Sequence, residues 1–367
     1  MGTLDTFQIE EEMEHFQQYE HLTGHDLINS LVNDETFVRI LKTRQRSSQR
    51  IRLKYMKSKL VKSMEPMRYE NNSNFKMAPY QAWIQSGGQS TQSYYGWRKL
   101  RILLHVLEYI MTKSKSEARL CFAEPPTLDI DTFPWWGHYE IIPVLWDCWP
   151  KFWDATEEWF REHAVKSAVF TSSQTAAEFR HRFPEMNILT ITEGIETNLY
   201  HGERCLQERS IDFLQFGRVT KMFEELHFDE SLHVVSSCNE QALLHTRADL
   251  IRALSDSKIV LAVPRCDMQP ELAQGIETLT QRYWECMLSG VVILGRAPKE
   301  LKELIGYDPV IPLDYEHTAD QIKDIVEHIS EYQELVDRNL QVAKQQADWI
   351  LRIHQIREWL CTNGYSV

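Results

Sequence analysis

Short apolar segments of strand length alternate with helix-like segments along most of this 367-residue chain. Each strand of a parallel sheet needs a long crossover connection, so this alternation predicts a parallel, doubly wound α/β architecture. A polar stretch at 201–210 divides the series, and we expect two α/β domains with a hinge there. The predicted strands cover 80–85, 118–126, 141–146, 167–171 and 188–192 before the hinge, and 211–217, 258–264 and 291–294 after it.

The two ends of the chain are typical of helices. Residues 1–78 lack a convincing buried strand, so we expect a helical extension ahead of the first domain. Apolar residues at helical spacing predict a further helix over 97–111, and 319–359 reads as helices. Gly87 and Gly88 follow the first predicted strand, and a glycine pair at such a turn would let a ligand approach the backbone closely.

The composition limits the classes of function. A net charge of −13 makes a general nucleic-acid role unfavourable, because phosphate backbones require a basic surface. The seven cysteines are scattered singly, which argues against a disulfide framework and a zinc knuckle and favours a reducing cytosol. No apolar run has the length of a spanning helix, and no secretory leader is evident. We therefore expect a cytoplasmic protein.

Charge is distributed unevenly near the N-terminus. Residues 39–62 contain ten Lys and Arg and no acid, whereas 1–36 are rich in Glu and Asp. One interpretation is a solvated helix paired with the acidic segment. The other is a basic patch that contacts an anionic membrane surface, on the inner face, or a lipid-linked acceptor.

Two carboxylates separated by seven residues form the most informative motif. Glu277 and Glu285 flank Thr-Leu-Thr-Gln-Arg-Tyr-Trp, and Gly290 follows. Thr278 with Gln281 fits a capping box and Gly290 suits a helix end, so we expect Glu277 in the preceding loop and Glu285 inside a helix. Carboxylates accept hydrogen bonds from pairs of sugar hydroxyls, and the N–H groups of a helix start suit a diphosphate.

Cations follow the first strand after the hinge. The strand 211–217 ends at Gly217-Arg218, and Lys221 comes three residues later. Ligands of open parallel sheets collect beyond the carboxyl ends of the strands, where two cations can neutralise a diphosphate. Solvated surface cations are the alternative.

Tryptophan is concentrated in one block, where the alternatives are an acceptor cleft and ordinary core packing. Flat indole faces pack against sugar rings, and Trp also suits a membrane interface. His138 and Asp147, within the block, are candidate general bases. The block contains Trp135, Trp136, Trp146, Trp149, Trp153 and Trp159.

Residues 80–360 resemble glycosyltransferases of the GT-B architecture, in which two Rossmann-like domains face each other across a cleft. The resemblance is carried by Gly217-Arg218 with Lys221 and by the Glu-x7-Glu spacing of Glu277 and Glu285, as in retaining, family-4-like enzymes. It implies that Glu277 contacts the donor hexose, Glu285 the ribose, and Arg218 with Lys221 the pyrophosphate. Residues 193–200 match the loop that closes the first domain, although Glu193 replaces the usual Asn.

The resemblance implies a domain organisation and a set of roles. Beyond the extension, we expect an acceptor domain at 79–205, a nucleotide-sugar domain at 206–345, and a helix at 346–367 that returns to the first domain. The candidate catalytic residues are Glu277, Arg218, Lys221, Asp147 and His138. The donor candidates are Gly217, Arg218, Lys221, Glu277, Thr278, Thr280, Gln281, Arg282 and Glu285, and the acceptor candidates are Gly87, Gly88, Trp135, Trp136 and Trp149.

The expected reaction moves a sugar from a nucleotide diphosphate to an acceptor hydroxyl on a glycan, a lipid-linked carrier or a small molecule, as in polysaccharide biosynthesis. Charge develops on the leaving diphosphate, so preorganised cations should contribute most to catalysis. We expect retention of configuration and no metal or other cofactor, since no acidic Asp-x-Asp motif stands in a suitable context. The alternatives are a sugar-nucleotide 2-epimerase and a non-catalytic scaffold on the same fold.

Overall fold

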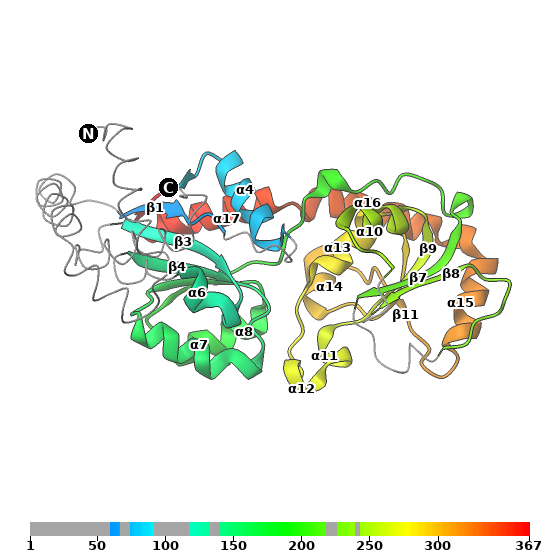
Figure 1. Ribbon diagram of the computed structural model, residues 1–367, viewed down its shortest axis with the longest axis horizontal. Coiled ribbons are helices and arrows are strands. Elements are labelled where there is room, and N and C mark those ends of the chain that lie inside the picture. The colour runs from blue at the N-terminus through cyan, green and yellow to red at the C-terminus, as the bar shows by residue number, and fades with distance from the viewer. Residues whose placement is uncertain (1–58, 67–73, 92–116, 133–138, 218–225, 239–242) are drawn as a thin grey trace, which may run out of the picture.

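The computed structural model describes residues 59–66, 74–91, 117–132, 139–217, 226–238 and 243–367. These form two α/β units side by side, joined by two chain crossings (Figure 1). All strand pairs in both sheets are parallel. The prediction of two doubly wound domains is therefore confirmed.

The first sheet has the strand order β12-β1-β3-β4-β5-β6, with β2 also paired to β1. Its helices lie on both faces, with α4 and α17 on one side and α7 and α8 on the other (Figure 1). The strands are β1 Lys59–Ser63, β2 Gln89–Ser90, β3 Glu117–Ala123, β4 Glu140–Leu145, β5 Ser167–Phe170, β6 Asn187–Thr190 and β12 Tyr365–Ser366. The helices are α4 Met77–Gln85, α6 Leu128–Thr132, α7 Pro150–Glu162, α8 Ser173–Arg182 and α17 Trp349–Thr362.

The second sheet has the order β11-β10-β9-β7-β8. Helices α13 and α16 pack on one face and α15 on the other, again around two apolar clusters. The strands are β7 Ile211–Gly217, β8 Val234–Cys238, β9 Ser257–Ala262, β10 Val292–Gly295 and β11 Ile311–Pro312. The helices are α10 Arg247–Ser255, α11 Arg265–Met268, α12 Pro270–Ala273, α13 Gln281–Leu288, α14 Lys299–Ile305, α15 Thr318–Glu327 and α16 Gln333–Gln346.

The beginning of the first domain differs from the prediction. Residues 59–63, placed in the helical extension, are strand β1 between β12 and β3, with Val61 fully buried. Residues 80–85 are not a strand but part of α4, whose Trp83 and Ala82 face the core. Residues 1–58 and 67–73 of the extension and the predicted helix at 97–111 lie outside the described residues.

The last two cations of the basic stretch 39–62, Lys59 and Lys62, lie in β1. Lys59 forms an ion pair with Glu140, and Lys62 lies 3.4 Å from Glu117. Two of the ten cations thus balance acids of β3 and β4 rather than forming a free patch, while 39–58 lie outside the described residues. Among the described residues, no helix is long and apolar enough to cross a membrane.

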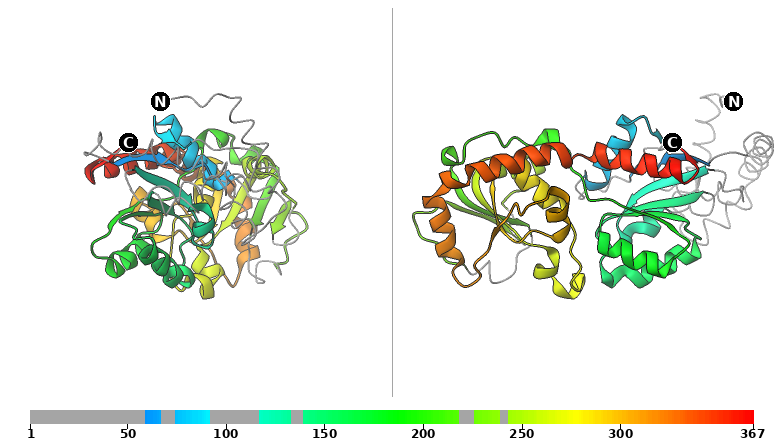
Figure 2. Two further views of the ribbon diagram at one scale, coloured as in Figure 1. Left: turned by 60° about the vertical axis from the view of Figure 1, so that its left-hand side comes forward. Right: turned by 180° about the vertical axis from the view of Figure 1, so that it is seen from behind.

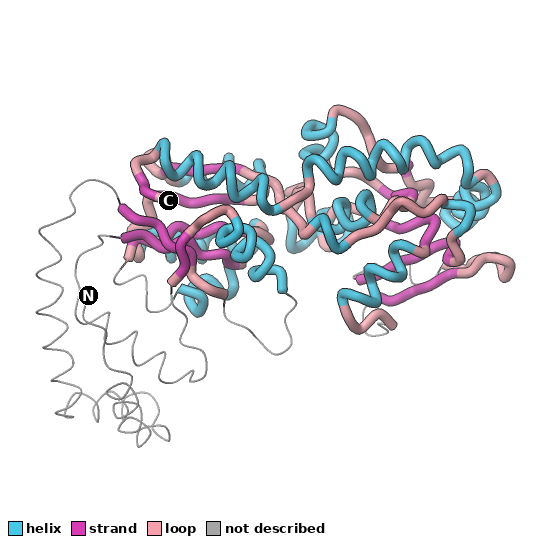
Figure 3. Tube along the Cα trace, turned by 90° about the horizontal axis from the view of Figure 1, so that it is seen from above, coloured by secondary structure: helices cyan, strands magenta, loops and turns pink. Residues whose placement is uncertain are grey.

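The two chain crossings lie against each other. Ile195 N–H donates to the carbonyl of Ala347 over 2.8 Å, and Trp349 N–H donates back to Ile195 over 3.2 Å. A Cβ on Gly194 would lie 2.9 Å from the Trp349 backbone, so glycine permits this approach. Helix α17 then runs back along the first sheet (Figures 2 and 3), where Ile353 and other apolar residues join its core.

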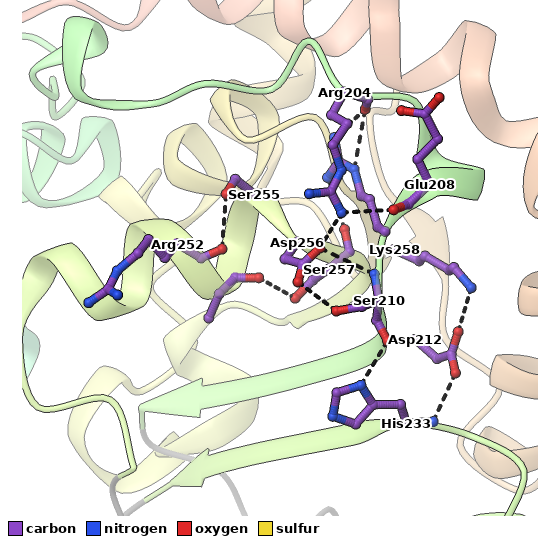
Figure 4. A network of polar contacts seen from close by, with 12 residues as sticks. Arg204, Glu208, Ser210, Asp212, His233, Arg252, Ser255, Asp256, Ser257 and Lys258 are labelled. Carbon is purple, nitrogen blue, oxygen red and sulfur yellow. Dashed lines mark hydrogen bonds and ion pairs between the residues drawn. The ribbon is translucent and has the colours of Figure 1, made fainter.

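The segment expected to be the hinge, 201–210, is bound to the second domain. Asp256 forms an ion pair with Arg204 and accepts from the Ser210 hydroxyl over 2.5 Å (Figure 4). The guanidinium of Arg209 is buried and donates to the carbonyls of Ser257 and Ser289 over 2.9 and 3.0 Å. The outgoing chain therefore crosses between the two domains near Ile195, before the segment 201–210.

Candidate functional site

Helix α13 carries the spaced carboxylates as expected in outline. It spans Gln281–Leu288, with Glu277 in the preceding loop and Glu285 inside the helix. The predicted capping box of Thr278 with Gln281 is wrong, because Thr280 is the N-cap residue and its side chain makes no capping hydrogen bond.

Glu285 is tied to the chain crossing. The Tyr200 phenol donates to Glu285 Oε1 over 2.9 Å. Burial raises the pKa of Glu285, and the hydrogen bond from Tyr200 and the charges of Arg282 and Arg247 partly oppose the shift. Among the described residues, Tyr200 is the only hydrogen-bond donor to this carboxylate, which leaves acceptor capacity for a ligand.

Arg282 and Gly217 meet at the carboxyl end of β7. The Arg282 guanidinium lies over the Phe216 ring, 4.6 Å from its centroid. Gly217 has φ +78°, and a Cβ there would lie 2.4 Å from Arg282 Nη2, so a side chain at this position would displace the cation. Gly217 of β7 and Arg282 of α13, both predicted to bind the nucleotide-sugar, are thus brought together. Arg218 and Lys221 lie outside the described residues.

Glu277 is held by residues that the sequence did not indicate. Its Oε1 forms an ion pair with Arg296, and its Oε2 accepts from Lys299 N–H over 2.9 Å. Arg296 in turn makes two hydrogen bonds of 2.7 Å to the carboxylate of Asp267. Since a carboxylate has about four lone-pair sites, roughly two remain for a ligand.

A small pocket lies between the two domains, beyond the carboxyl ends of β4 and β5. Three predicted site residues, Asp147, Trp149 and Thr278, line it. Asp147 follows β4 with φ +51° and lies 3.7 Å from Arg265 across the cleft. The same Arg265 guanidinium lies 5.5 Å from the centroid of the Trp149 ring. Hydroxyl groups of the first domain complete the wall, from Thr171, Ser172 and Thr175.

The described part of the Trp block is mostly core. Trp146, Trp149 and Trp159 are buried, and the indole N–H groups of Trp146 and Trp159 donate to Glu124 and Asp129 of the first domain. Among the described residues, the buried Trp149 N–H has no hydrogen-bond partner. Trp149 alone of these three lines the pocket between the domains. Trp135, Trp136 and His138 lie outside the described residues.

The glycine pair has a different setting from the one predicted. Gly87 and Gly88 follow helix α4 rather than a strand, and Gly87 adopts φ +81° where the helix ends. A Cβ on Gly88 would lie 2.3 Å from the Trp83 indole, so the pair packs tightly on α4. The predicted strand–glycine–helix order is therefore wrong, and acceptor binding by these glycines stays a prediction.

Glu193 is a further residue of the site that the sequence reading did not select. It is buried, with 7% of its surface exposed, and its carboxylate lies beside Gln281 at the start of α13. Burial first, and then the charges of Asp147, Glu300 and Glu124, raise its pKa well above 4.5. The only signal in the sequence was its replacement of the usual Asn in the closing loop.

Comparisons with known structures agree with this geometry. No protein-family model matches the sequence, and a search of curated proteins finds no match. HepE of Anabaena, in its crystal structure with UDP and glucose, superposes with a TM-score of 0.54 at 11% identity, over 83% of this chain and 100% of that one. Its complex with UDP-glucose gives 0.53 at 12% identity with the same coverage. The chain therefore has the two-domain GT-B fold.

Proposed function

We propose that this chain is a glycosyltransferase that moves a sugar from a UDP-sugar to an acceptor hydroxyl. The supporting observation is the grouping of Glu285, the Arg282 guanidinium and the left-handed Gly217 between α13 and the carboxyl end of β7. This is where ligands of open α/β sheets bind. HepE, which has the same fold, is seen with UDP and with UDP-glucose, and this favours UDP as the carrier.

In the proposed complex, Glu285 accepts the ribose hydroxyls and Arg282 faces the diphosphate. Arg218 and Lys221, three residues apart after β7, would add charge to the leaving group. Glu277, fixed by Arg296, would accept hexose hydroxyls with its remaining lone pairs. Asp147, which lines the pocket 3.7 Å from the Arg265 guanidinium, would serve the acceptor.

We also propose retention of the anomeric configuration and activity without a metal ion. Retention is what the resemblance to Glu-x7-Glu enzymes implies, and metal independence is expected because no acidic Asp-x-Asp motif stands in a suitable context. The product's anomeric proton in an NMR spectrum distinguishes retention from inversion. Activity in EDTA, compared with activity in added Mg²⁺ or Mn²⁺, tests the second point.

The test of donor binding is a calorimetric titration of UDP and of uridine, with EDTA present, after a thermal-shift panel of UDP-, GDP-, dTDP- and ADP-sugars. Ligand at 100 times its Kd should add ~2.7 kcal/mol of stability. Because uridine keeps the ribose but lacks phosphate, Glu285→Ala should weaken both ligands. Arg282→Ala should weaken UDP by about tenfold, or ~1.4 kcal/mol, and leave uridine unchanged.

Glu303→Ala is the matched control, since Glu303 is exposed on α14 and pairs only with Lys299 among the described residues. Its affinities should equal those of the wild type. Absence of binding by every nucleotide to a folded wild-type sample would contradict the proposal and favour the scaffold alternative. Interconversion of UDP-N-acetylhexosamines without acceptor would favour the epimerase instead.

A further inference from the structure

One carboxylate joins the two domains beside the donor loop. Glu300, in the first turn of α14, places Oε1 2.5 Å from both the N–H and the hydroxyl of Ser173, the first residue of α8 in the other domain. Its Oε2 accepts from Leu279 N–H, in the loop between Glu277 and α13, over 3.0 Å. Glu300 thus contacts both domains at once.

Ser173 lies at the N-terminus of α8, and this position favours an acid such as Glu300 as its partner. The first N–H groups of a helix have no partner within the helix, and the N-terminus carries partial positive charge. Ser172 caps α8 by accepting from Thr175 N–H, which leaves Ser173 N–H for an external acceptor. A carboxylate at this position is favoured by both the hydrogen bonds and the helix dipole.

The same loop makes three further contacts with the first domain. Gln174 Oε1 accepts from Glu277 N–H over 2.6 Å, and the Thr278 hydroxyl donates to Thr171 O over 3.3 Å. The Ser172 hydroxyl lies 3.4 Å from Glu277 O. The loop 277–279 is therefore bound by residues 171–174 on one side and by Glu300 of α14 on the other, through its backbone at Glu277 and Leu279 and through the Thr278 hydroxyl.

We propose that Glu300 is a positioning residue that couples closure of the two domains to the conformation of the loop carrying Glu277. This inference rests on the proposed function, because transfer from a donor on one domain to an acceptor on the other requires the two domains to close. When the domains separate, Ser173 leaves Oε1 and the loop loses its contacts with α8. Glu300 then holds Leu279 alone, and the backbone of Glu277 loses its contacts with Gln174 and Ser172, so that Arg296 and Lys299 alone hold this residue.

The test compares Glu300→Ala, Glu300→Gln and Ser173→Ala with the control Glu303→Ala. Small-angle X-ray scattering with and without UDP reports the domain separation, calorimetry reports UDP affinity, and UDP-glucose consumption reports turnover. In Glu300→Ala we expect a larger radius of gyration and a fall in kcat of about tenfold, the value of one lost charge-assisted contact. UDP affinity should change less than about threefold, because Glu285 and Arg282 stay in place.

Glu300→Gln should be intermediate, since an amide offers one oxygen acceptor where the carboxylate offers two. Adding Ser173→Ala to Glu300→Ala should change nothing further, because the shared contact is already lost. A wild-type radius of gyration and wild-type kcat in Glu300→Ala would overturn the inference. A wild type that binds no UDP would overturn the proposed function, and the scattering result would still decide on the contact between domains.

Discussion

At the scale of single residues, the start of α13 brings acids together in a buried place. Glu193 lies beside Gln281 at the start of the helix, where burial and then the charge of Asp147 raise its pKa. Trp284 donates its indole N–H to the Glu193 backbone carbonyl over 3.0 Å, which fixes the residue from the second domain. A helix N-terminus favours an anion, but burial and the neighbouring charges oppose it more strongly.

This conflict makes stability depend on pH. The folded pKa of Glu193 is raised above 4.5, so above that pH the folded state binds more protons than the unfolded state. Stability from this group is fully present below about pH 4.5 and is lost as the pH rises toward the folded pKa. In Glu193→Gln the group cannot ionise, so the variant's free energy of unfolding relative to wild type should increase between pH 5 and pH 8.

Urea unfolding at several pH values measures this difference. Glu303→Gln, at an exposed position on α14, is the control and should follow the wild type throughout. A difference between Glu193→Gln and wild type that stays constant with pH would show that Glu193 titrates normally.

At the scale of elements, the buried strands could be predicted because their apolar runs are continuous. The runs at 141–146 and 211–217 became β4 and β7, with every residue of β4 buried. The run at 80–85 failed because Trp83 and Ile84 have strand propensity but stand on a helix that packs against α17. Tertiary contacts overrode local preference there.

Strand β1 was not predicted because its local sequence carries little strand signal. Its sequence, Lys-Leu-Val-Lys-Ser, ends a basic stretch, and the apolar pair is too short to stand out. The strand is stabilised because Lys59 pairs with Glu140 of β4 and Lys62 with Glu117 of β3, while Val61 enters the core. Such pairing across 55 to 81 residues cannot be read from local pattern.

The candidate site was predictable to a similar degree. The spacing of Glu277 and Glu285 placed one carboxylate before α13 and one within it. Partners such as Arg296 and Glu300 depend on the packing of α14 against the preceding loop and on contact between the domains. The spacing of residues along the chain predicts neither this packing nor this contact, so Arg296 and Glu300 could be identified only from the structure.

The position of β1 gives a prediction at this scale. Val61 is fully buried inside the sheet, so Val61→Ala removes two methyl groups and leaves a cavity. We expect the free energy of unfolding to fall by about 2 kcal/mol. Leu304→Ala, at a position 40% exposed, is the control and should cost much less. Equal effects of both substitutions on urea unfolding would argue against a core strand at 59–63.

At the scale of the whole molecule, the two domains are connected by the two chain crossings as well as by contacts across the cleft. Arg352 is buried at the start of α17 and donates to Thr192 O over 3.1 Å and to Gln346 O over 2.6 Å. These carbonyls belong to the outgoing and returning crossings. Burial lowers the pKa of Arg352 to about 10, so the guanidinium is still charged at neutral pH. One side chain therefore fixes the two crossings to each other.

Replacing this side chain should uncouple the unfolding of the domains. In Arg352→Met the two carbonyls lose their donor, at a cost of about 1–3 kcal/mol each if they stay buried, and the crossings can separate. We expect differential scanning calorimetry to resolve two transitions where the wild type shows one, or the gap between transitions to widen. Arg252→Met, at a side chain 77% exposed on α10, should leave the profile unchanged. An unaltered profile in Arg352→Met would mean that contacts such as the one between Glu300 and Ser173, rather than the crossings, make the two domains unfold together.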